Sequence, residues 1–176
     1  MPSNRFGPGV SLAHQLADFW PDDTIGIIKV ASGGSGVRAF EKNWSFERAE
    51  RTFDGKKGSF YKDLMHLSQK GLLESTLVVV STEFGRKPDV NPNRGRDHHP
   101  DGFTCLMAGA GVKAGQIYGT TSSDGKHAEE NIMDVTDFNA TIAWRLGIDP
   151  AFEENTPNGH PFKLANRGEA RKELFS

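Results

Sequence analysis

The sequence predicts a single α/β domain, built as a three-layer sandwich with a mostly parallel sheet and helices on both faces. The chain has 176 residues, a length at which one domain buries roughly 70% of the surface that its unfolded chain exposes. Segments with helical spacing of apolar residues alternate along it with short, continuous apolar runs. Because strands that are apolar on both faces are typical of parallel sheets covered by helices, this alternation favours the layered fold.

The continuous apolar runs predict the strands. The strongest run is STLVVVST, followed along the chain by GFTCLMAGA. We expect LVVV and FTCLM to be neighbouring buried strands, with IGIIKV in the same sheet and a short further strand in HPFKLA. The expected strands are therefore residues 24–31, 75–82, 102–110 and 160–165.

The helical segments begin and end at residues that favour helix termini. Ser59 is suited to the N-cap of a helix over 59–71, and Gly71 is suited to its C′ position. Two further helices are expected over 9–20 and 134–147, and a short one within 44–53. In the 134–147 helix, Asp134 and Asp137 favour the N-terminus, Gly147 ends it, and the aligned apolar residues are Val135, Phe138, Ile142 and Leu146.

Composition narrows the class of protein. The formal net charge is −2 and the pI is about 6.3, so no basic surface for nucleic acid is expected. No apolar run approaches the roughly 20 residues of a membrane span, and the first residues lack the apolar core of a signal peptide. The single cysteine, Cys105, excludes an intrachain disulfide and is expected to be a buried, inert thiol.

A polar loop over residues 83–101 follows the strongest strand and carries side chains that bind metals. Glu83 comes directly after the strand, so it is expected at the carboxyl edge of the sheet, where ligands bind in such folds. Asp97, His98 and His99 are the other candidate ligands for a divalent ion such as zinc, manganese or iron. Adjacent residues of an extended segment point to opposite sides, so at most one histidine of the pair is expected to face a given site.

The same loop carries arginines that are suited to an anion. Paired guanidinium donors match the oxygens of phosphate or sulfate, which makes Arg86, Arg94 and Arg96 candidates for substrate binding. The alternative is a solvated, salt-bridged loop with a structural histidine.

A second loop, SGGSG over 32–36, follows the first expected strand. The backbone amides of Gly33 and Gly34 are candidates for an oxyanion hole. Ser32 and Ser35 are candidate nucleophiles, although no G-x-S-x-G motif surrounds them. The alternative is an ordinary tight turn.

From about residue 71 to 176 the chain resembles domain-of-unknown-function family 1501, which is similar to the sulfatases and alkaline phosphatases. The resemblance is carried by GLLESTLVVVSTEFGR, GRDHHPDGFTCLMAGAGVKAGQIYGTT, DVTDFNATIAWRLGI and KELF. It implies that Glu83 and either His98 or His99 are metal ligands. Phe84 departs from the pattern, because the phosphatases carry a second ligand at that position.

Residues 1–65 resemble a different family, the sialate O-acetylesterase domain of carbohydrate esterase family 6. FGPGVSLAHQLADFWPDDTIGIIKVASGGSG and GSFYKDLM carry this resemblance. It implies a metal-independent serine esterase with Gly33 and Gly34 at the oxyanion hole. The two resemblances meet near residues 62–72 and suggest a fusion of two partial domains, each without the segments that carry the main catalytic residues of its family.

Three functions follow from these patterns. The first is a hydrolase-like domain of alkaline-phosphatase or sulfatase type, incomplete and of uncertain activity, with a divalent metal (zinc or manganese) and a phosphate or sulfate ester as substrate. The second is a carbohydrate O-acetylesterase that acts on an acetylated sugar. The third is a catalytically dead binding or structural module. Exposed sheet edges would favour a homo-oligomer, and neither nucleic acid nor a membrane is expected as a partner.

Overall fold

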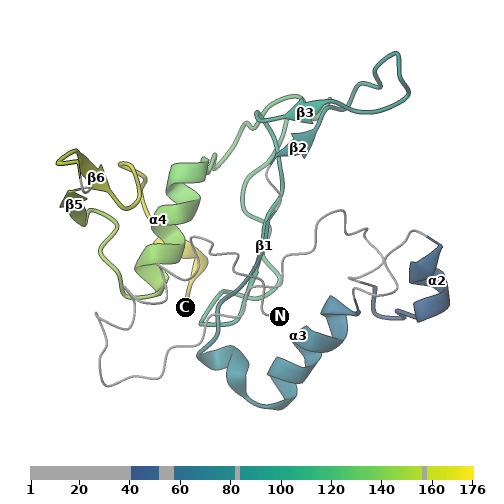
Figure 1. Cartoon of the computed structure of the whole chain (residues 1–176), viewed down its shortest axis with the longest axis horizontal. Helices are drawn as coiled ribbons and strands as arrows, with labels where there is room; N and C mark the ends of the chain where they lie inside the picture. Colours follow the sequence, from purple (N-terminus) through teal and green to yellow (C-terminus); the bar gives the residue numbers. More distant parts are fainter. Residues whose placement is uncertain (1–40, 52–57, 82–83, 156–157) are drawn as a thin grey trace. The chain divides into compact units, whose positions relative to one another are not determined.

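The computed structural model describes residues 41–51, 58–81, 84–155 and 158–176 (Figure 1). The chain forms two compact units, Met1–Leu64 and Met65–Ser176, with the boundary inside helix α3. The expected helix over 9–20 and strand over 24–31 lie outside the described residues. Within the described part, no helix has the length and apolar character that a membrane crossing requires.

Two short helices confirm local predictions. Helix α2, Phe46–Glu50, begins at Ser45, whose hydroxyl accepts a hydrogen bond from the Arg48 amide at 3.4 Å. Helix α3, Phe60–Gln69, follows Ser59, whose hydroxyl accepts from the Lys62 amide at 3.2 Å. Gly71 stands two residues after α3 with a φ of 70°, the left-handed conformation that favours glycine at the end of a helix. A 3₁₀ turn, η3 at Leu72–Glu74, then leads toward the first strand.

The two strongest apolar runs are neighbours, as predicted, but they run antiparallel. Strand β1, Val78–Val80, pairs with β4, Leu106–Ala108, so that Val79 lies opposite Met107. Both strands are three residues long, which is shorter than the runs that contain them. The prediction that both strands are buried is wrong, because their residues are half-buried apart from Leu106, which is 62% exposed.

The prediction of a three-layer sandwich with a mostly parallel sheet is wrong. The strands in the described residues form three separate antiparallel pairs: β1–β4, β2–β3 and β5–β6. A parallel pair needs a long crossover, usually a helix. The described connection between β1 and β4 instead carries the β2–β3 hairpin and no helix. Continuous apolar runs this short are compatible with several arrangements, and here they do not mark strands covered on both faces.

The last pair of strands lies near the end of the chain. Strand β5, Glu153–Asn155, pairs with β6, Pro161–Lys163, and an ion pair joins Glu153 to Lys163. Strand β6 confirms the short strand expected within 160–165. A 3₁₀ turn, η4 at Lys172–Leu174, follows.

Helix α4, Val135–Arg145, packs against residues 169–176, hereafter the 169–176 segment. Ala140, Thr141 and Ala143 are the buried residues of the helix. The 169–176 segment contributes Leu174 and Phe175 to the same core. The Phe175 ring meets the Trp144 ring edge-on, with the centroids 5.5 Å apart.

The predicted apolar face of α4 is not its buried face. Val135 is 54% exposed and Leu146 is 37% exposed, whereas Thr141 is completely buried. The small side chains Ala140 and Ala143 allow the backbone of another segment to approach closely. The partner of the helix therefore decides which face is buried, and the spacing of its largest apolar residues does not.

Asp134 caps α4, and its contribution to the free energy of unfolding is expected to depend on pH. Its carboxylate accepts hydrogen bonds from the Thr136 hydroxyl at 2.6 Å and from the Asp137 amide at 2.8 Å. These two bonds, the hydroxyl first, hold the pKa of Asp134 below its ordinary value of 3.8. At neutral pH we expect Asp134→Ala to lower the free energy of unfolding by about 1 kcal/mol.

Because the folded pKa lies below the unfolded one, the contribution of Asp134 is complete above the unfolded pKa and is lost as the pH falls through the folded pKa. Urea unfolding of wild type and Asp134→Ala should therefore show a stability difference that shrinks below about pH 4. A difference that stays constant over the acid range would argue against the cap.

Candidate functional site

The polar loop after β1 is built on a short hairpin. Strand β2, Gly85–Arg86, pairs antiparallel with β3, His98–His99, and Figure 1 shows the long loop that joins them. The Lys87 amide donates to the Asp97 carbonyl at 2.9 Å and extends the pairing. Glycine is required at position 85, because a Cβ there would lie 2.0 Å from the carbonyl oxygen of Gly102.

The loop of this hairpin is organised around Asn91. The side-chain oxygen of Asn91 accepts hydrogen bonds from the Asn93 amide at 3.1 Å and from the Gly95 amide at 2.9 Å. Its side-chain nitrogen donates to the carboxylate of Asp97 at 2.8 Å. One of the candidate metal ligands is therefore already bound to an amide of its own loop.

Two of the candidate anion-binding arginines donate to backbone carbonyls. Arg96 Nη1 donates to the Lys87 carbonyl at 2.9 Å and also to the Pro88 carbonyl. Arg86 Nη1 donates to the Arg96 carbonyl at 3.2 Å, and its guanidinium lies 5.3 Å from the centre of the Phe84 ring. Both side chains brace the hairpin from which they come.

The two adjacent histidines lie on opposite sides of β3, as expected for an extended segment. His98 is exposed, and its ring stacks on the Phe84 ring with the centroids 3.7 Å apart. His99 is only 5% exposed, and its Nε2 lies 3.2 Å from the Gly125 carbonyl oxygen. Its Nδ1 is buried and has no hydrogen-bond partner. One ring nitrogen of His99 is therefore buried without a hydrogen bond.

Several predicted site residues lie outside the described residues. These are Glu83, Gly33 and Gly34, together with Ser32 and Ser35. Among residues 41–51, 58–81, 84–155 and 158–176, no group of three or more His, Cys, Asp or Glu side chains is placed to hold a metal ion. The predicted metal ligands Asp97, His98 and His99 are thus close in sequence but are not brought together as a ligand set there.

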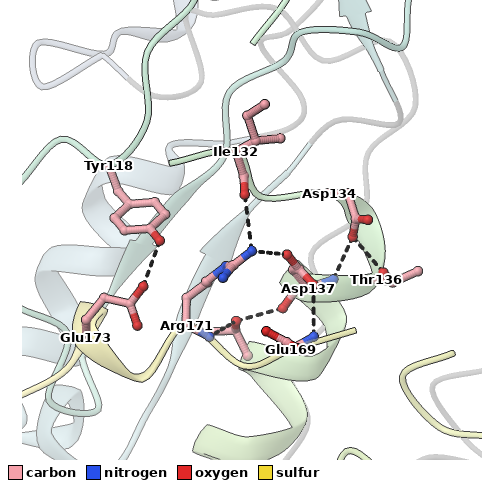
Figure 2. Close-up of polar contacts among 9 residues, drawn as sticks. Tyr118, Ile132, Asp134, Thr136, Asp137, Glu169, Arg171 and Glu173 are labelled. Carbon is pink, nitrogen blue, oxygen red and sulfur yellow. Dashed lines mark hydrogen bonds and ion pairs between the residues drawn. The ribbon is translucent and has the colours of Figure 1, made fainter. Parts of the chain in front are cut away.

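A second polar cluster, which the sequence does not predict, holds the 169–176 segment against α4 (Figure 2). Asp137 forms an ion pair with Arg171 and accepts a hydrogen bond from the Glu169 amide at 2.8 Å. Thr141 accepts from the Arg171 amide at 2.9 Å and donates to the Asp137 carbonyl at 2.7 Å. Figure 2 shows the Arg171 guanidinium between the Asp137 carboxylate and the Ile132 carbonyl, to which it donates at 3.3 Å.

Tyr118 extends this cluster by donating its hydroxyl to the Glu173 carboxylate at 2.7 Å (Figure 2). Burial, followed by the bond to Glu173, raises the pKa of Tyr118 above 10. The same bond lowers the pKa of Glu173 below its ordinary value of 4.5. The cluster is a set of structural contacts in which, among its buried side-chain atoms, only Arg171 Nε has no hydrogen-bond partner within the described residues. The role that these contacts support is the attachment of a chain segment.

The sequence could not have revealed this cluster by motif. Asp137 is readily interpreted as a carboxylate that favours the N-terminus of a helix, and Arg171 lies 34 residues later in a polar stretch. One signal in the sequence was available: two aspartates, Asp134 and Asp137, stand at the start of α4, but a helix needs only one of them as its N-cap. The second carboxylate could therefore have been expected to bind another partner.

Comparison with known proteins identifies a family and nothing more specific. The chain matches the family described as "Protein of unknown function (DUF1501)" over residues 47–175. The match starts within the segment that resembles the esterase, and nothing found supports that resemblance or a fusion. No curated protein and no solved structure matches the chain. Since the matched region covers well over half of the sequence, the chain belongs to the DUF1501 family of proteins of unknown function.

Proposed function

We propose that this chain is a hydrolase-like domain of the alkaline-phosphatase and sulfatase type that acts as a binding or structural module and does not turn over esters itself. The first part of the proposal is supported by the resemblance of EFGR and GRDHHPDGF to the DUF1501 family, which is similar to the sulfatases and alkaline phosphatases. The observation that carries the second part is the use of Arg86 and Arg96, which brace the backbone of their own hairpin.

An arginine that binds a phosphate or sulfate ester presents paired donors to the anion. Arg96 Nη1 already bridges the carbonyls of Lys87 and Pro88, and Arg86 Nη1 holds the carbonyl of Arg96. An incoming anion that used either Nη1 group would have to compete with these bonds, and apparent affinity falls when the binding-competent arrangement is only a small fraction of the population. The hairpin is therefore better suited to holding its own shape than to holding a substrate.

A second candidate function, metal-dependent hydrolysis of phosphate or sulfate esters, is favoured by His99. Its buried Nδ1 without a partner is the kind of donor that a zinc or manganese ion would satisfy. Glu83 and His99 would hold the ion, with Asp97 as a third ligand after its release from Asn91. His98 is the alternative to His99 and not its companion, because the two side chains lie on opposite sides of β3. A bound ion would supply Lewis-acid polarisation of the ester oxygen and an activated water.

Turnover of three chromogenic esters separates these functions. Purified chain is incubated with p-nitrophenyl phosphate, sulfate and acetate, each with added zinc or manganese and each with a chelator. A nucleophile and its base must lie within hydrogen-bond reach of each other. The segments that carry the main catalytic residues in the two resembled families are not found in this sequence, so we expect no turnover above buffer in any arm.

Two results would contradict this expectation in different ways. Chelator-sensitive turnover of phosphate or sulfate that disappears in Glu83→Ala would establish the metal-dependent function. Metal-independent acetate turnover that is lost in Ser32→Ala or Ser35→Ala would establish the esterase function. Asp89→Ala, which removes an exposed carboxylate of the same loop, is the control for a general effect of charge.

A further inference from the structure

We propose that a pocket at the end of α4 binds a small organic monoanion that carries a ring, of the carboxylate or sulfonate class. The pocket is lined by the end of α4, the turn at 147–151, strand β6, residues 167–170 and Lys172, and has a volume of about 770 Å³. All of these elements belong to the unit Met65–Ser176. The site is separate from the β2–β3 hairpin and does not depend on the function proposed above.

The size and walls of the pocket suit a ring. Its volume lies within the roughly 300–1,000 Å³ of small-molecule sites. Apolar wall residues include Trp144, Ile148 and Pro150. The indole of Trp144 is held by the edge of the Phe175 ring at 5.5 Å, so it is a fixed aromatic surface against which a ring can pack.

The charged lining sets the sign of the ligand. Three cations, Lys163, Arg167 and Lys172, line the pocket together with two carboxylates, Asp149 and Glu169. Glu153, which is not part of the lining, neutralises Lys163, so the sign of the ligand depends on which of the remaining charged groups lacks a partner. A dianion would meet the Asp149 and Glu169 carboxylates without further compensation, so a monoanion is the expected form.

Of the three cations in the lining, Arg167 is the one proposed to bind the anionic group of the ligand. Lys163 is paired with Glu153, and the Lys172 ammonium lies 5.6 Å from the centre of the Trp144 ring. Within the described residues, Arg167 has no hydrogen bond or ion pair. Its planar guanidinium supplies the paired donors that a carboxylate or sulfonate accepts.

The backbone holds Arg167 in an uncommon conformation. Asn166 and Arg167 have φ angles of 45° and 73°, and a non-glycine residue in the left-handed region is strained. The next residue, Gly168, lies so close to the start of α4 that a Cβ would be 2.0 Å from the Thr136 carbonyl oxygen. This close approach anchors the turn that carries Arg167, and sustained strain of this kind is found often at binding sites.

The proposal can be tested with the fluorescence of Trp144. The chain has three tryptophans, and Trp20→Phe with Trp44→Phe leaves Trp144 as the reporter. Benzenesulfonate is titrated into the full chain; it has no ester bond, so any hydrolase activity is irrelevant to the result. We expect a saturable change in Trp144 emission, and no such change with benzylammonium or benzyl alcohol.

Two variants locate the binding. Arg167→Ala and Arg167→Gln are each expected to weaken benzenesulfonate binding about tenfold or more, since each removes a charge-assisted pair of donors. The matched control is Arg94→Ala, because Arg94 is also an exposed arginine with a positive φ, 61°, and lies in the other anion candidate, the β2–β3 hairpin. The Arg94→Ala variant should bind benzenesulfonate with the affinity of the wild type.

Three results would overturn the proposal. The first is the absence of both a fluorescence change and a calorimetric signal with benzenesulfonate. The second is equal affinity in wild type and in the two Arg167 variants. The third is binding that is lost in Arg94→Ala and kept in Arg167→Ala, which would assign the anion to the hairpin.

Discussion

Replacing Phe175 with alanine is expected to lower the free energy of unfolding by about 3–5 kcal/mol, as for other buried phenylalanines. Phe175 is 8% exposed and packs edge-on against Trp144, with the Arg145 guanidinium 5.7 Å from its ring centre. Its backbone forms a bridge with Val112, and the amide of Ser176 donates to the Gly111 carbonyl at 2.9 Å. Phe175 thus connects two parts of the fold: its ring packs against α4, and its backbone pairs with Val112, about 60 positions earlier in the sequence.

The measurement is urea unfolding of the full chain, followed by circular dichroism. Phe162→Ala is the matched control, because Phe162 is 54% exposed and its truncation should cost well under about 1 kcal/mol. Equal losses for the two variants would mean that the 169–176 segment does not pack against α4 in solution.

Replacing Asp137 with alanine is the second large effect, and we expect a loss of about 2–4 kcal/mol. The side chains of Asp137 and Arg171 are 14% and 27% exposed, so the pair is mostly withdrawn from water. The variant leaves the Arg171 guanidinium without its carboxylate and the Glu169 amide without its acceptor. A charge or donor left unpaired in such a place costs more than the lost bond itself.

The control for this effect is another ion-paired aspartate. Asp89 lies 3.2 Å from the Lys126 ammonium, but both side chains are largely exposed, so Asp89→Ala should cost no more than about 1 kcal/mol. Asp137→Asn keeps an oxygen for the Glu169 amide and is expected to fall between the two. A similar small loss for Asp137→Ala and Asp89→Ala would refute a structural role for the Asp137–Arg171 pair.

Local structure was predictable wherever the determining residues are close in sequence. Ser59 and Asp134 mark the starts of α3 and α4 because a cap depends on an amide only three residues away. Gly71 marks the end of α3 for a similar reason, since only the local backbone must adopt a positive φ. The opposite orientation of His98 and His99 follows from the alternation of a strand.

Features set by distant segments were not predictable. The run over 75–82 identifies β1, but its direction relative to β4 depends on the intervening hairpin, which the apolar pattern does not encode. Likewise, the buried face of α4 depends on the 169–176 segment, which reaches Asp137 and Thr141 across about 30 residues. The carbonyl partners of Arg86 and Arg96 depend on the backbone path of the hairpin, so residue type alone suggested an anion site.

Thermal unfolding with and without metal shows whether the side chains of residues 84–101 serve as scaffold or as ligands. A ligand that binds the folded state at 100 times its dissociation constant stabilises it by about 2.7 kcal/mol, which raises the melting temperature by several degrees. If they serve as scaffold, we expect the same melting temperature in excess zinc and in chelator, and a lower one for Arg96→Ala in both conditions. A rise of several degrees with zinc that is abolished by Glu83→Ala or His99→Gln would contradict this expectation.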